Sequence, residues 1–307
     1  MRRVRYEHGG GPEVLFLEDA PVPDPGPGEL LVRVEAVGVT LPVVRKVGEG
    51  RDPIPLGGEV AGEIVALGEG VTGHAPGDRV TGLVFGHGYA DYALLHTPMA
   101  SPVPDGASAV DAVALVRSGL VAYGALEAAR AAPGESALVT AAASGVGHLA
   151  LQLAGLRGAS RVVAAVSDPR KADFVRGLGA DEVITYDRDD WGEPVDYVLD
   201  AVGGGLLTPA VKSLAPHGRL VAYSSGGGTV AAYDLLVGAK SVIGFQLGLI
   251  ARGRPELYEK WRRELWELHA AGRLRVAVHA EFALEEAARA HEVIEARANR
   301  GKVVLIP

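Results

Sequence analysis

Alternation of apolar and polar residues dominates the first third of the chain. Residues 31–36 (Leu-Val-Arg-Val-Glu-Ala) alternate with a period of two, and residues 62–67 and 79–84 are two further strand candidates. This period is typical of a half-buried β-strand. Stretches rich in Pro, Gly and Asp at residues 23–28 and 75–78 separate these segments and are typical of turns. The pattern predicts a β-barrel or β-sandwich domain.

From about Ser118 the pattern changes, and short apolar runs alternate with amphipathic segments. The apolar runs predict strands at residues 137–140, 161–166, 182–186, 195–199, 219–223 and 241–245, and the amphipathic segments predict helices at residues 146–156, 170–178 and 206–214. Alternation of this kind is typical of βαβ units on a parallel sheet. A helix at 255–271, an amphipathic segment at 284–296 and a strand at 302–306 complete the chain. We therefore expect the α/β fold class.

The composition narrows the classes of function. The chain has 307 residues, 48% of them hydrophobic, so its length suggests about two domains. The net charge is −8 with acidic and basic residues interspersed, so nucleic acid is not an expected partner. The absence of cysteine excludes disulfides and thiolate-ligated metal sites. The N-terminus lacks a signal-peptide apolar region and no run of about 18 apolar residues occurs, so we expect no membrane partner and a cytoplasmic location.

A run of small residues at 141–147 (Ala-Ala-Ala-Ser-Gly-Val-Gly) follows the strand predicted at 137–140 and opens the next helix. Dinucleotide-binding turns usually read G-x-G-x-x-G, and those three positions are Ala142, Ser144 and Gly147 here. Small side chains let backbone N–H groups approach a pyrophosphate, and the helix offers its positive end to the same charge. Ser144 departs from the motif and would either crowd the pyrophosphate or hydrogen-bond it. The alternative is a tight strand-to-helix turn without a ligand.

The end of the next strand bears on the choice of cofactor. A carboxylate there binds the ribose 2′-hydroxyl of NAD, whereas cations or hydroxyls favour the 2′-phosphate of NADP. The sequence supplies Ser167, Arg170 and Lys171 in favour of NADPH, and Asp168 against it. We weigh the two cations and the hydroxyl above one acid, because an acid one step past the strand can point to solvent. The alternative for Arg170 and Lys171 is a solvated helix face.

Motifs spread over nearly the whole chain resemble one known family. They are found at residues 55–59 (Pro-Leu-Gly-Gly-Glu) with 61–62, 76–80 (Pro-Gly-Asp-Arg-Val), 88–92, 119–123, 141–147, 178–186, 197–203 and 291–304. With these motifs the chain resembles the zinc-free medium-chain dehydrogenases/reductases, and specifically the NADPH quinone oxidoreductases of the zeta-crystallin group.

The resemblance implies a GroES-like β-barrel domain made from both chain ends around an inserted Rossmann domain, a doubly wound parallel sheet. We expect the GroES-like catalytic domain at residues 1–119 and 247–307 and the Rossmann domain at 120–246. The family also forms homodimers through the Rossmann edge strand, which matches residues 241–245. An apolar edge strand invites such pairing.

The resemblance and the small-residue turn together imply a set of NADPH-binding residues. The pyrophosphate turn, the 2′-phosphate site and the lining of the ribose and nicotinamide comprise Ser144, Gly145, Val146, Gly147, Ser167, Arg170, Lys171, Tyr186, Val202, Gly203, Ser224 with the following two residues, Phe245 to Leu247, and Arg297. Tyr186 could equally be a sheet-edge aromatic, and Arg297 a surface helix charge.

The positions that hold catalytic zinc in related alcohol dehydrogenases carry Thr40, Gly58 and about Arg117 here. None is a zinc ligand of the usual kind, so we expect no metal. Glu59 is then expected to be a buried acid paired with an N–H group or an Arg. His87 and His96 are expected to be solvated or hydrogen-bonded rather than ligands.

Without a Lewis acid, hydride addition is easiest to an electron-poor acceptor such as a quinone or an α,β-unsaturated carbonyl. Thr40 and Arg117 are the candidate catalytic residues, because each can donate a hydrogen bond to an acceptor oxygen. Arg117 could equally form a salt bridge at a domain interface. The alternatives are an enoyl-thioester or secondary-metabolite tailoring reductase, and a catalytically weak NADPH-binding protein with a structural or regulatory role.

Overall fold

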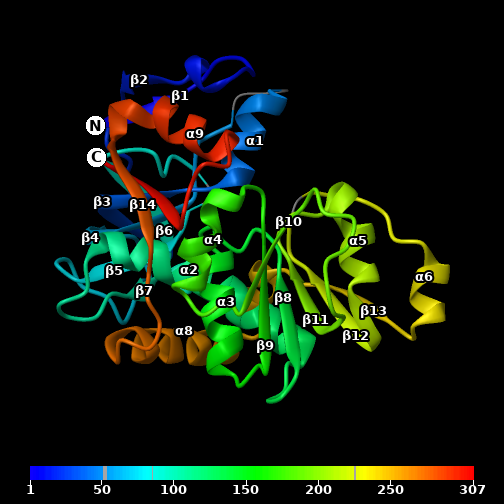
Figure 1. Cartoon of the computed structure of the whole chain (residues 1–307). Helices are drawn as coiled ribbons and strands as arrows, with labels where there is room; N and C mark the ends of the chain where they lie inside the picture. The colour runs from blue at the N-terminus through cyan, green and yellow to red at the C-terminus, as the bar shows by residue number, and fades with distance from the viewer. Residues whose placement is uncertain (51–53, 85, 225) are drawn as a thin grey trace. The chain divides into compact units, whose positions relative to one another are not determined.

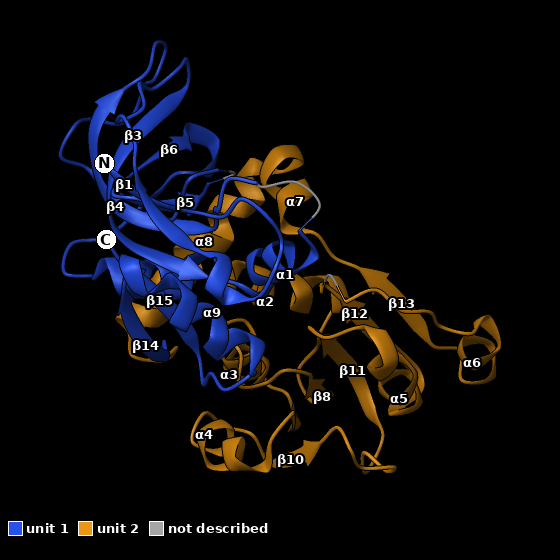
Figure 2. Ribbon diagram, turned by 90° about the horizontal axis from the view of Figure 1, so that it is seen from above, with its two compact units in different colours: residues 1–117, 276–307 blue, residues 118–275 orange. Residues whose placement is uncertain are grey.

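The computed structural model describes residues 1–50, 54–84, 86–224 and 226–307. The chain forms two compact units, one from Met1–Arg117 with Val276–Pro307 and one from Ser118–Arg275 (Figure 2). Both chain ends therefore belong to the first unit, and the second is inserted between them. The first boundary lies close to the expected residue 119, whereas the second lies at Arg275 instead of residue 246.

The first unit is built mainly of β-strands, drawn in blue and cyan and, near the C-terminus, in orange and red in Figure 1. Its strands are β1 Arg2–Arg5, β2 Phe16–Asp19, β3 Glu29–Val39, β4 Glu59–Leu67, β5 Arg79–Leu83, β6 Tyr92–His96, β7 Ser101–Pro102, β14 Val278–Ala283 and β15 Lys302–Ile306. The larger sheet has the order β14-β15-β3-β4-β5-β7, with β6 also paired to β3. Its helices are α1 Leu41–Glu49 and α9 Ala287–Glu295, with 3-10 turns at Pro12–Val14, Thr97–Met99 and Leu284–Glu286.

The second unit contains a parallel sheet with the strand order β10-β9-β8-β11-β12-β13. Its strands are β8 Ser136–Val139, β9 Arg161–Val166, β10 Glu182–Thr185, β11 Val195–Asp200, β12 Leu214–Ala222 and β13 Ser241–Gly244. Counted from β8, this order is 3-2-1-4-5-6, which is the order of a doubly wound dinucleotide-binding sheet. The expected fold class is confirmed, and the order reverses between β8 and β11.

Helices follow the strands of this sheet. They are α3 Gly147–Leu156, α4 Ala172–Arg176, α5 Leu207–Lys212, α6 Ala232–Val237, α7 Leu247–Gly253 and α8 Pro255–Ala270, with 3-10 turns at Pro169–Lys171 and Gly204–Leu206. Leu138, Val163, Val198 and Leu220, from four neighbouring strands, are each at most 1% exposed and form part of one apolar core cluster. Because both faces of a parallel sheet are covered, its strands read as continuous apolar runs.

The helix α2, Ala109–Ala129, has no counterpart among the elements predicted from the sequence. It is apolar around its circumference, so it lacks the one-sided pattern by which surface helices are recognised. By length and composition alone α2 could cross a membrane, but 78% of its most apolar 18-residue window is buried inside the protein. A helix buried in a protein core has this same composition.

Contacts of α8 and its neighbours explain the second boundary. The amide of Gln152 on α3 exchanges two hydrogen bonds with the backbone of Arg275, each of 2.9 Å. A Cβ atom on Gly119 of α2 would lie 3.0 Å from Leu265 of α8, and one on Gly124 would lie 2.8 Å from Trp261. These contacts attach residues 247–275 to the second unit.

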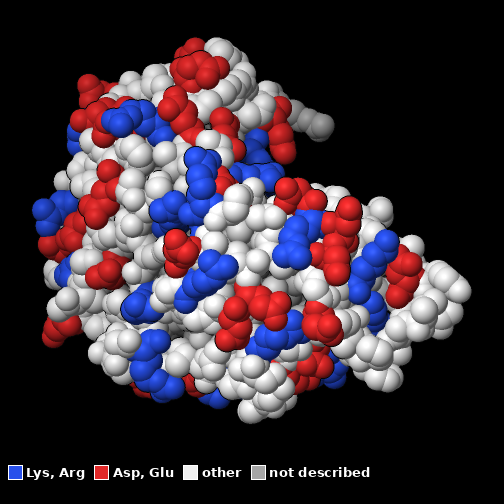
Figure 3. Space-filling view, viewed as in Figure 1, with Lys and Arg blue, Asp and Glu red and all other residues white. Residues whose placement is uncertain are grey.

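On the face drawn in Figure 3, Lys and Arg alternate with Asp and Glu in small groups. No single sign of charge dominates this face.

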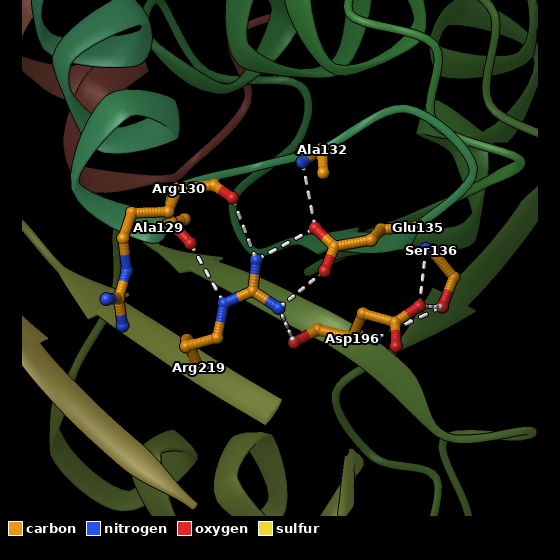
Figure 4. Close-up of polar contacts among 7 residues, drawn as sticks. All are labelled: Ala129, Arg130, Ala132, Glu135, Ser136, Asp196 and Arg219. Atoms are coloured by element: carbon orange, nitrogen blue, oxygen red, sulfur yellow. Dashed lines mark hydrogen bonds and ion pairs between the residues drawn. The ribbon is translucent and has the colours of Figure 1, made fainter. Parts of the chain in front are cut away.

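Arg219 of β12 organises the amino end of the parallel sheet (Figure 4). Its guanidinium donates two hydrogen bonds of 2.8 Å to the carboxylate of Glu135 and others to the carbonyls of Ala129 and Arg130, at 2.9 and 3.2 Å. Carbonyls at the end of a helix lack intrahelical partners, so this side chain caps α2 and joins it to the sheet. The side chain of Arg219 is 13% exposed, and that of Glu135 25%.

We expect Arg219→Met to lower the free energy of unfolding by about 1–3 kcal/mol, because it removes the guanidinium from a half-buried carboxylate and from two carbonyls at the end of α2. Urea denaturation followed by circular dichroism measures this loss. Arg176→Met is the matched control, since its ion pair with Asp173 is exposed and should be worth less than about 1 kcal/mol. Equal losses in both variants would contradict the capping role of Arg219.

The contribution of the Arg219–Glu135 ion pair to the free energy of unfolding depends on pH. The hydrogen bond from Arg219 lowers the pKa of Glu135 below its ordinary value of 4.5. The stabilisation is therefore complete above that pH and is lost as the pH falls through the lowered pKa. The difference between wild type and Arg219→Met should shrink correspondingly in acid.

Candidate functional site

All but one of the predicted cofactor residues follow strands of the parallel sheet. Parallel strands end at the same edge, so the segments after β8, β9, β10, β11, β12 and β13 share the carboxyl edge of the sheet. These segments contain residues 144–147, 167–171, 186, 202–203, 224 and 245–247. Arg297 is the exception, because it follows α9 in the first unit. Ser225 lies outside the described residues.

The small-residue turn after β8 has a tightly fixed backbone. Ala141 has a φ of +47°, and its carbonyl accepts a hydrogen bond of 2.8 Å from the N–H of Ser144. A Cβ atom on Gly147 would lie 2.1 Å from the carbonyl oxygen of Ala141, so only glycine fits there. The hydroxyl of Ser144 accepts the N–H of Gly147 at 3.0 Å and thereby caps the first turn of α3.

The turn after β11 is held by Asp200, the last residue of that strand. One carboxylate oxygen accepts hydrogen bonds from the Thr140 hydroxyl at 2.8 Å and the Val202 N–H at 3.2 Å. The other oxygen accepts the N–H of Gly203 at 2.9 Å. Asp200 and Thr140 are fully buried. The ends of β8 and β11, where the strand order reverses, are thus joined by side chains.

Glycines bring the turns after β11 and β12 close together. Gly203 has a φ of +71°, and a Cβ atom on it would lie 2.8 Å from the carbonyl of Gly227 and 2.9 Å from the hydroxyl of Ser224. The N–H of Gly204 donates to the same Gly227 carbonyl at 2.8 Å. Val202 and Ser224 are half-buried. This close approach holds two segments of the expected nicotinamide lining side by side.

The charged residues considered for the 2′-phosphate follow β9, and they differ in their contacts. The carboxylate of Asp168 accepts the backbone N–H of Arg170 at 2.8 Å and is also ion-paired with its guanidinium. Hydrogen bonds from Arg170 lower the pKa of Asp168 to about 2. Lys171 is buried, with 7% of its surface exposed, whereas Ser167 is exposed. Asp168 and Arg170 thus neutralise each other, and Lys171 and Ser167 determine the polarity of this position.

Tyr186, which follows β10, joins three strand ends. Its hydroxyl accepts the N–H of Ala141 at 2.7 Å and donates to the carbonyl of Ala165 at 3.3 Å. Its ring also packs against Trp191, with 6.4 Å between ring centroids. Tyr186 therefore has the structural role of an aromatic residue at the sheet edge, which the sequence left open. Phosphate binding by Tyr186 stays a prediction.

The segments after β12 and β13 complete this edge. The backbone N–H of Tyr223 donates to the carbonyl of Asp200 at 3.1 Å, and burial raises the pKa of the Tyr223 phenol. The phenol oxygen is buried and, among the described residues, has no hydrogen-bond partner. The ring of Phe245 lies over Gly124 of α2, where a Cβ atom would be 2.2 Å from it. Leu247 begins α7.

These features fit a dinucleotide. Gly147 and Gly203 remove side chains where backbone must come close, the start of α3 provides a positive helix end, and the Tyr223 phenol is a buried polar group available to a ligand. The carboxyl edge at the reversal of strand order is where such ligands bind in doubly wound sheets.

A buried group of charges occupies the first unit around Glu59, which is 1% exposed. Its carboxylate is ion-paired with the ammonium of Lys302, and the Arg117 guanidinium lies 3.6 Å away. Lys302 is on β15 and Glu59 on β4, the two neighbours of β3, and a Cβ atom on Gly38 of β3 would lie 2.6 Å from both side chains. Gly38 thus makes room for the pair.

The sequence predicts roles for two members of this group, Glu59 and Arg117. Glu59 was expected to be a buried, paired acid, and the two ion pairs confirm this. Burial lowers the pKa of Lys302, and Glu59 supplies the opposite charge that a buried ammonium requires. Arg117 is paired within the first unit and its side chain is 28% exposed, so its expected role as a ligand for an acceptor oxygen stays a prediction.

Thr40 directly precedes α1 and is 9% exposed, and its hydroxyl makes no capping hydrogen bond to the helix. Gly58 approaches the carbonyl of Gly38, since a Cβ atom on it would be 2.9 Å away. His87 and His96 belong to no group of three or more His, Asp or Glu side chains in the part of the chain that the structure describes.

The sequence reasoning missed Thr140, Asp200 and Tyr223 as members of the site. A weak signal existed, because Thr140 and Asp200 each directly follow three apolar or aromatic strand residues. Their partnership spans 60 residues and is visible only in the fold.

Comparisons with known proteins identify the family of this chain. Residues 26–105 match the alcohol dehydrogenase GroES-like domain, and residues 178–305 match a zinc-binding dehydrogenase domain. A quinone oxidoreductase of Pseudomonas aeruginosa is 33% identical, with 100% of this chain and 99% of the relative covered.

Two solved structures are similar over 100% of both chains. One is a mycobacterial protein in complex with NADPH, with a TM-score of 0.94 and 32% identity. The other is Escherichia coli quinone oxidoreductase in complex with NADPH, with a TM-score of 0.92 and 30% identity.

The sheet order, the glycine-dependent turns at its carboxyl edge and the full-length similarity agree with the resemblance expected from the sequence. The chain belongs to the quinone oxidoreductase family of the medium-chain dehydrogenases/reductases, with a GroES-like domain and a Rossmann domain.

Proposed function

We propose that this protein is an NADPH-dependent, metal-independent reductase that transfers a hydride to a quinone or an α,β-unsaturated carbonyl. The observation that carries the proposal is the set of fitted turns at the carboxyl edge of the parallel sheet, with buried Lys171 at the position expected for the 2′-phosphate. The two similar structures that contain NADPH support it. We place the protein in the cytoplasm, as its composition suggests.

The preference for NADPH over NADH follows from charge. Asp168 is held by the backbone and guanidinium of Arg170, so its oxygens are engaged away from a ribose hydroxyl. Lys171 and Ser167 then supply an ammonium and a hydroxyl, which favour a phosphate group. Arg297 is assigned to the same phosphate by family resemblance.

When bound, NADPH supplies the hydride. The protein binds and orients the cofactor and excludes water around the acceptor. Thr40 and Arg117 are the candidate donors to the acceptor oxygen as negative charge develops there. Thr40, Gly58 and Arg117 stand at positions that hold zinc in related enzymes, and a hydroxyl, a hydrogen atom and a guanidinium do not make a zinc site. Electron-poor acceptors suit this donor set, because they accept hydride without Lewis-acid activation.

We further propose a homodimer formed through β13. Within the described residues, β13 pairs on one side only, with β12, so its other edge is open. Val242 on this strand is 38% exposed, and Tyr233, Leu236 and Val237 on the preceding α6 are 70–75% exposed. An open strand edge beside exposed apolar side chains favours pairing with a second copy.

The enzymatic activity is tested by steady-state oxidation of NADPH with 1,2-naphthoquinone, 9,10-phenanthrenequinone, simple enones and enoyl thioesters. We expect turnover with the quinones or enones. Turnover restricted to enoyl thioesters would instead support the tailoring-reductase alternative. Tight NADPH binding without turnover of any acceptor would contradict the enzyme and leave the binding-protein alternative.

The cofactor preference is tested with Lys171→Ala. We expect the dissociation constant for NADPH to rise by about 10- to 100-fold, the size of a charge-assisted contact to phosphate, while that for NADH changes little. Lys212→Ala is the control, because Lys212 ends α5, which runs back from the carboxyl edge of the sheet. Fluorescence titration gives both constants. An equal effect on the two cofactors would remove Lys171 from the 2′-phosphate site.

The dimer is tested by analytical ultracentrifugation, which should give twice the mass of the chain. Leu236→Lys combined with Val242→Lys should shift the protein to the monomer, because two charges would be buried in the contact. Val22→Lys replaces another exposed apolar residue, in the first unit, and should leave the dimer intact. A monomeric wild type, or a dimer that survives both charges, would rule out this interface.

A further inference from the structure

Two matching pairs of side chains tie β8 to β11, one at each end. At the amino end, the carboxylate of Asp196 accepts the Ser136 hydroxyl at 2.8 Å and the Ser136 N–H at 2.7 Å. At the carboxyl end, the carboxylate of Asp200 accepts the Thr140 hydroxyl at 2.8 Å. Each hydroxyl in turn accepts a backbone N–H from the β11 side, from Asp196 itself at 3.1 Å and from Ala201 at 2.9 Å.

The two carboxylates have different electrostatic surroundings. The attraction of Arg219 and Arg161 contributes, after the hydrogen bonds from Ser136, to lowering the pKa of Asp196. Asp200 is fully buried, and none of the ion pairs among the described residues includes it. One pair therefore lies among cations, whereas the other places an acid at the cofactor edge with only neutral donors around it.

Three neutral donors converge on the side-chain oxygens of Asp200. The Thr140 hydroxyl donates to Asp200, and its oxygen accepts the N–H of Ala201. The N–H groups of Val202 and Gly203 also donate to Asp200, one to each oxygen. Both oxygens therefore act as acceptors, which is the arrangement that suits a carboxylate. A buried negative charge without a countercharge is costly, so a cation is the natural complement at this position.

Val202 and Gly203 belong to the segments expected to line the ribose and nicotinamide, and both donate directly to Asp200. Loss of a hydride, which is one proton with two electrons, leaves a nicotinamide ring with one positive charge, and the acceptor receives both electrons. Asp200 neither gains nor loses a proton in this exchange.

We propose that Asp200 is a positioning and electrostatic residue of this site, whose fixed negative charge favours the oxidised, positively charged nicotinamide over the reduced one. The inference rests on the proposed function, since it requires an NADPH site at this edge. It assigns Asp200 a part in driving hydride donation, because stabilising the oxidised cofactor favours the product side of the transfer.

The ratio of two dissociation constants isolates this effect. NADP⁺ and NADPH carry the same pyrophosphate and 2′-phosphate, so repulsion between Asp200 and the phosphates cancels in the ratio of their constants. Only the charge on the nicotinamide ring remains. We expect Asp200→Asn to raise the ratio of the NADP⁺ constant to the NADPH constant by about tenfold, as measured by isothermal titration calorimetry.

Three further variants make the test specific. Asp196→Asn removes the matching carboxylate about 13 Å away along the same strand, and it should leave the ratio at the wild-type value. Thr140→Val removes the hydroxyl but keeps the charge, so it should weaken both cofactors without changing the ratio. Asp200→Ser is a second neutral replacement if Asp200→Asn does not fold, because its hydroxyl can still accept a hydrogen bond.

An unchanged ratio in a folded, neutral Asp200 variant would overturn the proposal, as would an equal shift in Asp196→Asn. Failure of the wild type to bind NADPH would instead refute the proposed function itself. The two failures are therefore distinct.

Discussion

The pairing of β8 with β11 is the constraint on which the second unit depends. These strands are joined at both ends by a carboxylate and a hydroxyl, and the sheet reverses its strand order between them. Strands on either side of a reversal send their connections to opposite faces, so the loops diverge and leave room for a ligand. The two hydrogen-bonded pairs join the central strands at both ends, and the turns that follow β8 and β11 are therefore held next to each other.

The two ends of this strand pair serve different purposes. At the amino end, Arg219 gathers Glu135 and the last carbonyls of α2, so charge is compensated within the protein. At the carboxyl end, the donors to Asp200 among the described residues are a hydroxyl and two backbone N–H groups, all of them neutral. If these carboxylates served only to join β8 to β11, a cation could neutralise the carboxylate at each end of the strand pair. Within the part of the chain that the structure describes, the charge of Asp200 has no counterpart to Arg219, and this asymmetry is the basis of the electrostatic role proposed for Asp200.

Local patterns in the sequence were sufficient for much of the second unit. The strand at Arg161–Val166 lies where the sequence predicts it, because an apolar run bounded by turn residues is a strong local signal. The small-residue turn before α3 was recognised for the same reason. Helix α2 was missed because it is apolar on all sides, and Asp200 was missed because its partner Thr140 is 60 residues away. Local sequence patterns predict single helices and strands. They do not predict side-chain pairs such as Thr140 and Asp200, which only the strand order brings together.

The first unit shows the same limit in its charged group. Glu59 and Lys302 lie 243 positions apart in numbering, yet they meet across β3 because Gly38 has no side chain to separate them. Once that pair is buried, the Arg117 guanidinium at 3.6 Å is attracted to a carboxylate that already has a cation. Lys302 repels the guanidinium while Glu59 attracts it, so the net attraction of Arg117 to this pair is smaller than its attraction to a lone carboxylate would be. One buried carboxylate thus fixes two cations, the ammonium of Lys302 and the guanidinium of Arg117, and the second of these is the group proposed to donate to the acceptor oxygen.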